Sequence, residues 1–302
     1  MPSPPSRGIL YIASGPNFRA EAIISARSIK AVWPDMQFAI ITDQPVETGV
    51  FDVVQIAAMQ GDNIDKVRNI SLSPFERTIL LDSDTYYLQP FPELFDLLDH
   101  FQLAAAFDIS RFSERWESSI GRHVFIQTDG VPECFIELNT GVIAFRREPE
   151  VLQVFEQWLK ACLDTRRAAI PYGQDQPAFR KVIYNSGLRI ATLPSEYCFR
   201  LHTPDFARTA VKILHGRWTY SDLGPERGAV LARLGRLINR TMGTRILVHA
   251  FGIISGHGPY CIPLNEQHEQ LELVYKEPAP PPRFGHLGKL LMRWLVPEQR
   301  GK

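Results

Sequence analysis

Two aspartates separated by one serine, Asp82, Ser83 and Asp84, directly follow the apolar residues 79–81. The apolar run predicts a buried strand of a parallel sheet. Such sheets bind ligands at the carboxyl ends of their strands, and residues two apart in a strand point to the same side. Two carboxylates in one site need a shared proton or a cation, and a hard divalent ion with oxygen ligands commonly also binds phosphate. The stretch therefore predicts metal and phosphate chemistry, with a simple Asp-Ser loop cap as the alternative.

A phosphatase of the haloacid dehalogenase type is a competing interpretation, because that class also carries two aspartates after a strand. Such phosphatases have a small Thr or Val four positions after the first aspartate, where this sequence has the bulky Tyr86. Their strand also lies near the start of the domain, whereas here it ends at residue 81. This interpretation therefore ranks below the metal and phosphate site.

The bulk composition is that of an ordinary globular protein. The chain has 302 residues, of which 45% are hydrophobic and 22% charged, and its formal net charge is zero, so no overall field favours nucleic acid. Its four cysteines are scattered without a C-x-x-C pair, which is typical of a reducing compartment such as the cytoplasm. We expect no signal peptide, because the first residues lack an apolar segment, and no membrane span, because no stretch approaches about 20 apolar residues.

The elements before the aspartates predict the opening of a nucleotide-binding sheet. A strand over 8–13 precedes a helix that we expect to be capped by Asn17 and to reach Trp33, and a second strand covers 37–41. No glycine-rich dinucleotide or P-loop motif follows, which argues against a dehydrogenase and a P-loop ATPase. At the ends of the first two strands, nucleotide contacts are expected from Ala13, Ser14, Asn17 and Asp43.

A short helix over 65–72 carries two cations, Lys66 and Arg68, just ahead of the aspartates. One interpretation is that both are solvated surface charges, as most lysines and arginines are. The other is that they point at a nucleotide diphosphate. Both interpretations stay open.

Four later segments complete the pattern. A strand over 102–107 ends at Asp108, and strand character returns over 135–145 on both sides of Asn139-Thr140-Gly141. A helix fits 149–163, and a last apolar strand in 211–218 ends at His215, the histidine best placed to be a ligand. Between them lies an irregular polar segment, 110–134, of the size that is usually functional or mobile.

In this order, LLDSDT, LNTGV, GQDQPAF and ILHGRW resemble the motifs of metal-dependent glycosyltransferases of the GT-A type, especially family 8. The resemblance spans about 7–220. It implies an α/β fold with a mixed, mostly parallel sheet flanked by helices and a helical C-terminal extension. It also implies a nucleotide-diphosphate sugar as donor, with a UDP-sugar as the expected one.

The resemblance also assigns roles residue by residue. Asp82, Asp84 and His215 match the metal ligands, a set of two carboxylates and one imidazole that suits Mn²⁺ or Mg²⁺. The remaining matches are Ser83 at the cofactor between the metal ligands, Lys66 toward the nucleotide, Asn139, Thr140 and Gly141 at the donor sugar, Asp175 and Gln176 near the reacting carbon, and Gly216 and Arg217 near the diphosphate. Of these, Asp175, Gln176 and Asn139 are the expected catalytic residues.

One departure concerns the last motif. The family places Gly and then Lys-Pro-Trp several residues after the histidine, whereas here the string is compressed to His215-Gly216-Arg217-Trp218. Arg217 would replace the lysine, and we expect this loop to be built differently.

The mechanism leaves alternatives open. The resemblance implies retention of configuration, but an inverting enzyme needs a general base near the acceptor, and Asp175 fits that role as well as a sugar contact. A phosphatase or nucleotidyltransferase using the same aspartates, and a non-catalytic protein that binds sugar nucleotides, are the competing functions.

The C-terminal part, 223–302, follows a catalytic domain predicted over 1–222. Residues 226–242 and 284–295 both predict amphipathic helices with basic residues on one side. These helices either pack on the domain or rest on anionic lipid. Lipid contact would suit a carbohydrate or lipid-linked glycan of the cell envelope as acceptor.

Overall fold

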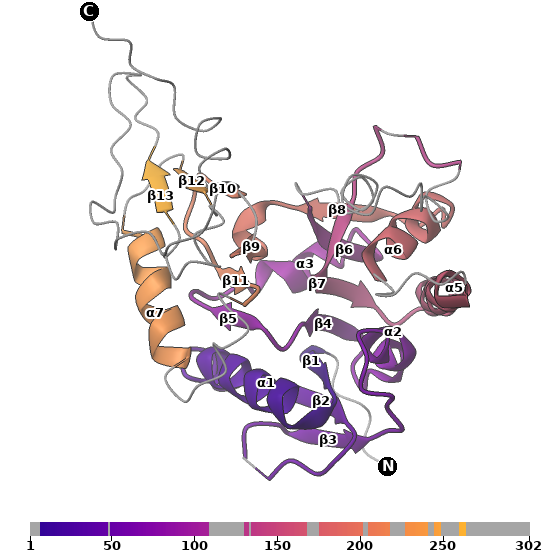
Figure 1. Cartoon of the computed structure of the whole chain (residues 1–302), viewed down its shortest axis with the longest axis horizontal. Coiled ribbons are helices and arrows are strands. Elements are labelled where there is room, and N and C mark those ends of the chain that lie inside the picture. Colours follow the sequence, from indigo (N-terminus) through magenta and orange to yellow (C-terminus); the bar gives the residue numbers. More distant parts are fainter. Residues whose placement is uncertain are drawn as a thin grey trace, which may run out of the picture.

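The computed structural model describes residues 7–47, 49–108, 130–132, 134–167, 175–201, 205–217, 227–240, 245–248 and 260–263. Its centre is a seven-stranded sheet flanked by helices (Figure 1). The strands are β1 (Arg7–Ala13), β2 (Phe38–Thr42), β3 (Val53–Ile56), β4 (Arg77–Leu81), β6 (Leu103–Phe107), β7 (Leu138–Arg146) and β8 (Ile190–Leu193), in the order β3-β2-β1-β4-β7-β6-β8. The expected mixed, mostly parallel α/β sheet is confirmed.

Strand β7 alone in this sheet runs against the others. It pairs antiparallel with both β4 and β6, while β1, β2, β3 and β4 pair in parallel, as do β6 and β8. The amino end of β7 therefore lies at the same edge of the sheet as the carboxyl ends of the other strands. This reversal brings 138–141 next to the aspartates that follow β4.

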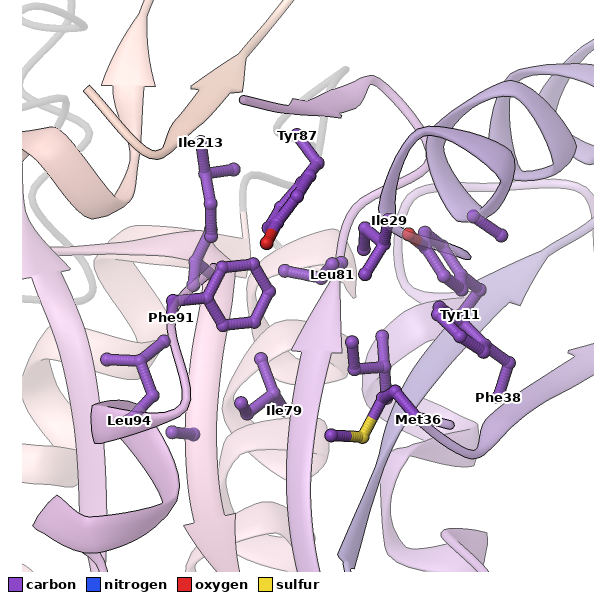
Figure 2. Close-up of a cluster of buried hydrophobic side chains, with 14 of the residues drawn as sticks. Tyr11, Ile29, Met36, Phe38, Ile79, Leu81, Tyr87, Phe91, Leu94 and Ile213 are labelled. Atoms are coloured by element: carbon purple, nitrogen blue, oxygen red, sulfur yellow. The ribbon is translucent and has the colours of Figure 1, made fainter. Parts of the chain in front are cut away.

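Side chains alternate between the two faces of the sheet, as the period of a strand requires. Ile79 and Leu81 face a cluster with α1 (Gly15–Lys30) and α3 (Glu93–Leu97), part of which is drawn in Figure 2. Leu80 faces the opposite cluster, with α2 (Asp65–Asn69), α5 (Pro149–Arg167) and α6 (Asp175–Tyr184). With both faces covered, the apolar run of β4 is fully buried, as its sequence predicted.

A second, small sheet links the aspartates to a distant segment. Its strands are β5 (Thr85–Tyr87), β9 (Phe199–Arg200) and β11 (Ile213–His215), in the order β5-β11-β9. The antiparallel β5–β11 pair places His215 opposite Thr85, the residue directly after Asp84. The third sheet is β10 (Asp205–Ala207), β12 (Arg245–Val248) and β13 (Tyr260–Pro263), which the sequence did not predict.

Helix α1 begins and ends earlier than expected. Ser14, in an extended conformation, is its N-cap, and the helix ends at Lys30 with Ala31 as C-cap. The expectation that Asn17 caps this helix is wrong, because Pro16 is accepted in the first turn, where a missing N–H has no cost. Helix α2 is extended by a 3₁₀ turn, η1 (Ile70–Leu72), and so covers the 65–72 range that the sequence predicted.

Helix α7 (Arg227–Ile238) packs on the domain. Leu231, Leu234 and Ile238 are buried against Phe199 and Leu214, so its apolar side does not face outward, while Arg233, Arg236 and Arg240 are exposed. The packing alternative is therefore favoured for 226–242. Among the residues that the structure describes, no helix is both long and apolar enough to cross a bilayer. The predictions for 284–295, for 110–129 and for Trp218 concern residues outside those that the structure describes.

Candidate metal and nucleotide site

The aspartates after β4 meet the start of β7 through the backbone. Leu81 pairs with Val142, and the N–H of Asp82 donates to the carbonyl of Gly141 at 2.8 Å. The Asn-Thr-Gly stretch is therefore part of a continuous strand instead of a turn. Its polar side chains lie at the sheet edge only because β7 runs in the reverse direction.

His215 reaches this edge from the β5–β11 pair. Its Nε2 lies 3.6 Å from Oδ2 of Asp82 and 3.5 Å from Oδ1 of Asp84. The imidazole lies directly over Gly141, where a Cβ would come within 2.2 Å of the ring. Only a glycine at position 141 leaves enough space for the imidazole of His215 to approach the strand.

Asp82, Asp84 and His215 fit a divalent cation. One donor atom from each lies within 4.8 Å of the others. Two ligand atoms about 2.1 Å from a common ion lie up to about 4 Å apart, so small side-chain rotations close the set. The separations of 3.5 and 3.6 Å between the imidazole and the carboxylates are those of ion pairs longer than a normal hydrogen bond, and a bound cation would replace the proton of the imidazole. Carboxylate oxygens with one imidazole suit Mn²⁺ or Mg²⁺.

Opposite charges set the protonation of these ligands. Burial raises the pKa of Asp82, but Lys66 and His215 more than offset it and the pKa lies below its ordinary value. Burial likewise raises the pKa of Asp84, yet His215 and Arg217 lower it far more. Burial lowers the pKa of His215, while the Cys198 sulfur and the Asp84 carboxylate raise it well above its ordinary value. Both aspartates are therefore ionised at neutral pH, as metal ligands must be.

Lys66 joins the first aspartate to the predicted D-Q pair. Its Nζ lies 3.0 Å from Oδ1 of Asp82 and 3.0 Å from Oδ2 of Asp175, and it donates to the carbonyl of Thr140 at 3.1 Å. The Thr140 hydroxyl donates to Asp175 at 2.9 Å. Burial lowers the pKa of Lys66, but the two carboxylates raise it above its ordinary value, so the ammonium stays charged. Four of the predicted residues thus form one charged group.

Arg217 contacts the second aspartate from the loop after His215. Gly216 has φ of 109°, a conformation that glycine adopts without strain, and its N–H donates to the carbonyl of Asp84 at 3.1 Å. This turn directs Arg217 so that its Nη1 lies 3.3 Å from Oδ2 of Asp84. A second cation therefore stands beside the second aspartate.

The residues predicted at the nucleotide lie at the ends of β1 and β2. Asp43 accepts from the N–H of Gly15 at 3.0 Å and from Arg19, and these contacts lower its pKa against the opposing effect of burial. Ala13 and Ser14 are buried beside them, whereas Asn17 is exposed. Because β1, β2 and β4 are parallel, this group shares the sheet edge with the metal ligands.

Arg68 does not join Lys66. Its guanidinium binds Asp62 at 2.8 Å and Gln60 at 2.9 Å in the loop before α2, and Asp65, the first residue of α2, at 2.8 Å. Lys66 and Arg68 are two positions apart in α2, and side chains two positions apart do not share a face of a helix. The nucleotide contact predicted for Arg68 stays a prediction that no contact of this structure supports.

Asn139 and Gln176 belong to a buried network. Gln176 donates from Nε2 to Oδ2 of Asp108 at 2.9 Å and to Oε1 of Glu137 at 2.7 Å, and Asn139 donates to the same Asp108 oxygen at 3.0 Å. Arg200 pairs with Asp108 as well. The carboxamide of Gln176 is thus held by two carboxylates, while Asp175 beside it faces Lys66.

Sequence reasoning missed several residues that contact the site or the network beside it: Glu21, Glu137, Cys198, Arg200 and Arg227. Glu137 directly precedes the LNTGV motif, whereas the other four have no motif around them, and their partners lie elsewhere in the chain. Asp108 carried a signal, because it directly follows a buried strand and so falls at the ligand-binding edge of the sheet.

Comparisons with known proteins give similarities to solved structures only. No family model matches the sequence, and no curated protein matches it. The chain is similar to the galactosyltransferase LgtC in complex with donor and acceptor sugar analogues, at 16% identity and a TM-score of 0.49 over 75% of this chain and 95% of that one. It is similar to the bifunctional glycosyltransferase WbbM at 15% identity and a TM-score of 0.49, over 76% of this chain and 52% of that one. It is similar to mouse xyloside xylosyltransferase 1 at 13% identity and a TM-score of 0.45, over 70% of this chain and 97% of that one. We therefore infer function from the geometry of the site and not from these similarities.

Proposed function

We propose that this protein is a metal-dependent glycosyltransferase that moves a sugar from a nucleotide-diphosphate donor, a UDP-sugar as first candidate, to a carbohydrate or lipid-linked glycan. The observation that carries the proposal is the convergence of Asp82, Asp84 and His215 within 4.8 Å at the ligand-binding edge of the sheet. The ordered motifs of the sequence, LLDSDT, LNTGV, GQDQPAF and ILHGRW, support the same function.

The charges around the ligands suit a diphosphate leaving group. A divalent ion held by the three ligands would stabilise the negative charge that develops as the nucleotide diphosphate departs. Lys66 contacts Asp82 and Arg217 contacts Asp84, and carboxylates hold both cations in place, so they add positive charge without further reorganisation. Asp43 would offer a carboxylate acceptor for the nucleoside at the same edge, beside the buried residues Ala13 and Ser14.

Asp175 has two roles compatible with its position. Its carboxylate accepts from Thr140 and pairs with Lys66, so it is held beside the metal ligand Asp82, which pairs with the same lysine. That placement supports a contact with the donor sugar in a retaining reaction, and a general base in an inverting one. We propose retention, and the anomeric configuration of the product measured by NMR decides between the two.

The experiment is a panel of nucleotide sugars incubated with the purified protein and Mn²⁺, scoring slow release of nucleotide diphosphate. We expect release from one donor, lost on addition of EDTA and in Asp84→Asn, and unchanged in Asp35→Asn, which replaces an exposed aspartate after α1. Tight donor binding without release, even with candidate acceptors present, would instead identify a non-catalytic binding protein. Phosphate released from simple monoesters would identify a phosphatase.

A further inference from the structure

Helix α1 carries a buried carboxylate, Glu21, that is 1% exposed and lies behind the metal ligands. Arg217 donates to it from Nε at 2.7 Å and from Nη2 at 2.6 Å. Arg227, the first residue of α7, donates from Nη1 at 3.0 Å, and the hydroxyl of Ser83 donates at 2.9 Å. Ions buried this deeply are stable only with charged or hydrogen-bonding partners, which these side chains supply.

The contact with Glu21 fixes which edge of Arg217 faces the site. The two parallel hydrogen bonds occupy Nε and Nη2, so Nη1 is the nitrogen directed at Asp84, 3.3 Å away. The ring of Phe18 lies 5.1 Å from the guanidinium carbon and covers one face. The orientation of Arg217 is therefore set by helix α1.

The same carboxylate fixes the residue between the two metal ligands. Ser83 follows the buried strand β4, and its hydroxyl points at Glu21 while Asp82 and Asp84 both face His215. Rotation of the Ser83 side chain away from Glu21 would remove this hydrogen bond. The turn that presents both carboxylates is thus tied to a helix that supplies no ligand itself.

We propose that Glu21 is a positioning residue that fixes the 82–84 turn and Arg217 together and, through Arg227, makes their geometry depend on helix α7. For catalysis this rests on the proposed function, since only a diphosphate or metal ligand needs that geometry. The positioning itself is a property of the metal-free protein and can be tested without any substrate.

The first experiment is hydrogen–deuterium exchange on the full metal-free chain. Arg227→Met removes the link to α7, and Arg233→Met is its matched control, because Arg233 is an exposed arginine of the same helix. We expect Arg227→Met to speed exchange both in the first turn of α7 and in the peptide that contains 82–85, and Arg233→Met to change neither. Faster exchange confined to α7 would overturn the proposal.

The second experiment is a double-mutant cycle in binding of UDP with Mn²⁺. Glu21→Asp keeps the negative charge but shortens the side chain by one methylene. Arg217→Lys keeps the positive charge but removes the two parallel N–H donors of the guanidinium. If Glu21 acts through Arg217, each variant weakens binding about tenfold, and the double variant weakens it no more than the stronger single one. Additive losses would overturn the proposal.

Wild-type protein that binds neither Mn²⁺ nor UDP would refute the proposed function, and the exchange experiment would still decide the role of Glu21.

Discussion

The sulfur of Cys198 lies 3.3 Å from Nδ1 of His215. Its S–H donates to Oδ1 of Asn139, also at 3.3 Å, so the sulfur is left to accept from the Nδ1–H of the imidazole. When the histidine donates from Nδ1, its Nε2 faces the two aspartates, and Nε2 is the nitrogen that a metal would bind. The thiol therefore orients the candidate ligand and links it to the start of β7.

Replacing this thiol should weaken metal binding. We expect Cys198→Ala to lower the affinity for Mn²⁺ about tenfold, the usual effect of removing the partner of a ligating histidine, and Cys198→Ser to restore most of it. Titration of Mn²⁺ followed by electron paramagnetic resonance measures this. Cys162→Ala is the matched control, because Cys162 is as deeply buried but lies in the core cluster around α5. Equal affinities for Cys198→Ala and wild type would show that the thiol does not orient His215.

Adding one methyl group at Gly141 should displace the imidazole. A Cβ there would lie 2.2 to 2.6 Å from three ring atoms of His215, closer than real contacts allow. We expect Gly141→Ala to lower Mn²⁺ affinity by at least about tenfold while leaving β7 folded, as judged by circular dichroism. Gly228→Ala is the control, since its nearest neighbour, a methyl group of Ile24, would lie at an ordinary 3.5 Å. Unchanged Mn²⁺ affinity in a folded Gly141→Ala protein would contradict the assignment of His215.

Removing Lys66 should affect metal and nucleotide in opposite directions. Its ammonium neutralises Asp82 and Asp175, so it competes with a bare cation but attracts a diphosphate. We expect Lys66→Met to bind Mn²⁺ alone more tightly and UDP with Mn²⁺ about tenfold more weakly. Calorimetry of both titrations tests this, with Lys160→Met, at an exposed ion pair of α5, as the control. Weaker binding of both partners in a folded Lys66→Met protein would rule out this competition.

Stability should fall as the pH rises through the acid range because of Asp205. Burial raises the pKa of this aspartate from 3.8 to about 6, against the hydrogen bonds from the N–H groups of Arg200 and Phe206. The raised pKa means that the folded protein holds this proton more tightly than the unfolded chain. The associated stability is complete below pH 3.8 and is lost as the pH rises through about 6, by about 3 kcal/mol.

Asp205→Asn should remove that contribution to the pH dependence. Urea unfolding at pH 4.5, 5.5 and 6.5 measures the free energy of unfolding for each variant, with Asp96→Asn, an exposed aspartate of α3, as the control. The Asn variant loses one hydrogen-bond acceptor at all three pH values. Its free energy of unfolding, relative to that of the wild type, should nevertheless increase as the pH rises. Parallel curves for wild type and Asp205→Asn would disprove the raised pKa.

The sequence by itself determined the strand β4 and the edge of the central sheet at which we propose the chemistry, but not the small third sheet. The apolar run of 79–81 and the two acidic residues after it define a buried strand and its ligand-binding end, because both depend on neighbours along the chain. The helix α5 and the candidate ligands Asp82 and Asp84 follow from the same local patterns. Helix boundaries were less determined, and Ser14 rather than Asn17 caps α1 because a proline is tolerated in the first turn.

Only the tertiary structure decided how the distant groups meet. The reversal of β7 brings Thr140 to Asp82, and the β5–β11 pair brings His215 to Asp84, because strand direction and pairing depend on the whole sheet. The buried contacts of Glu21 with Arg217 and Arg227 join residues 196 and 206 positions apart. No local sequence pattern predicts such pairs, because a buried charge is stabilised by a partner that comes close to it only when the chain is folded.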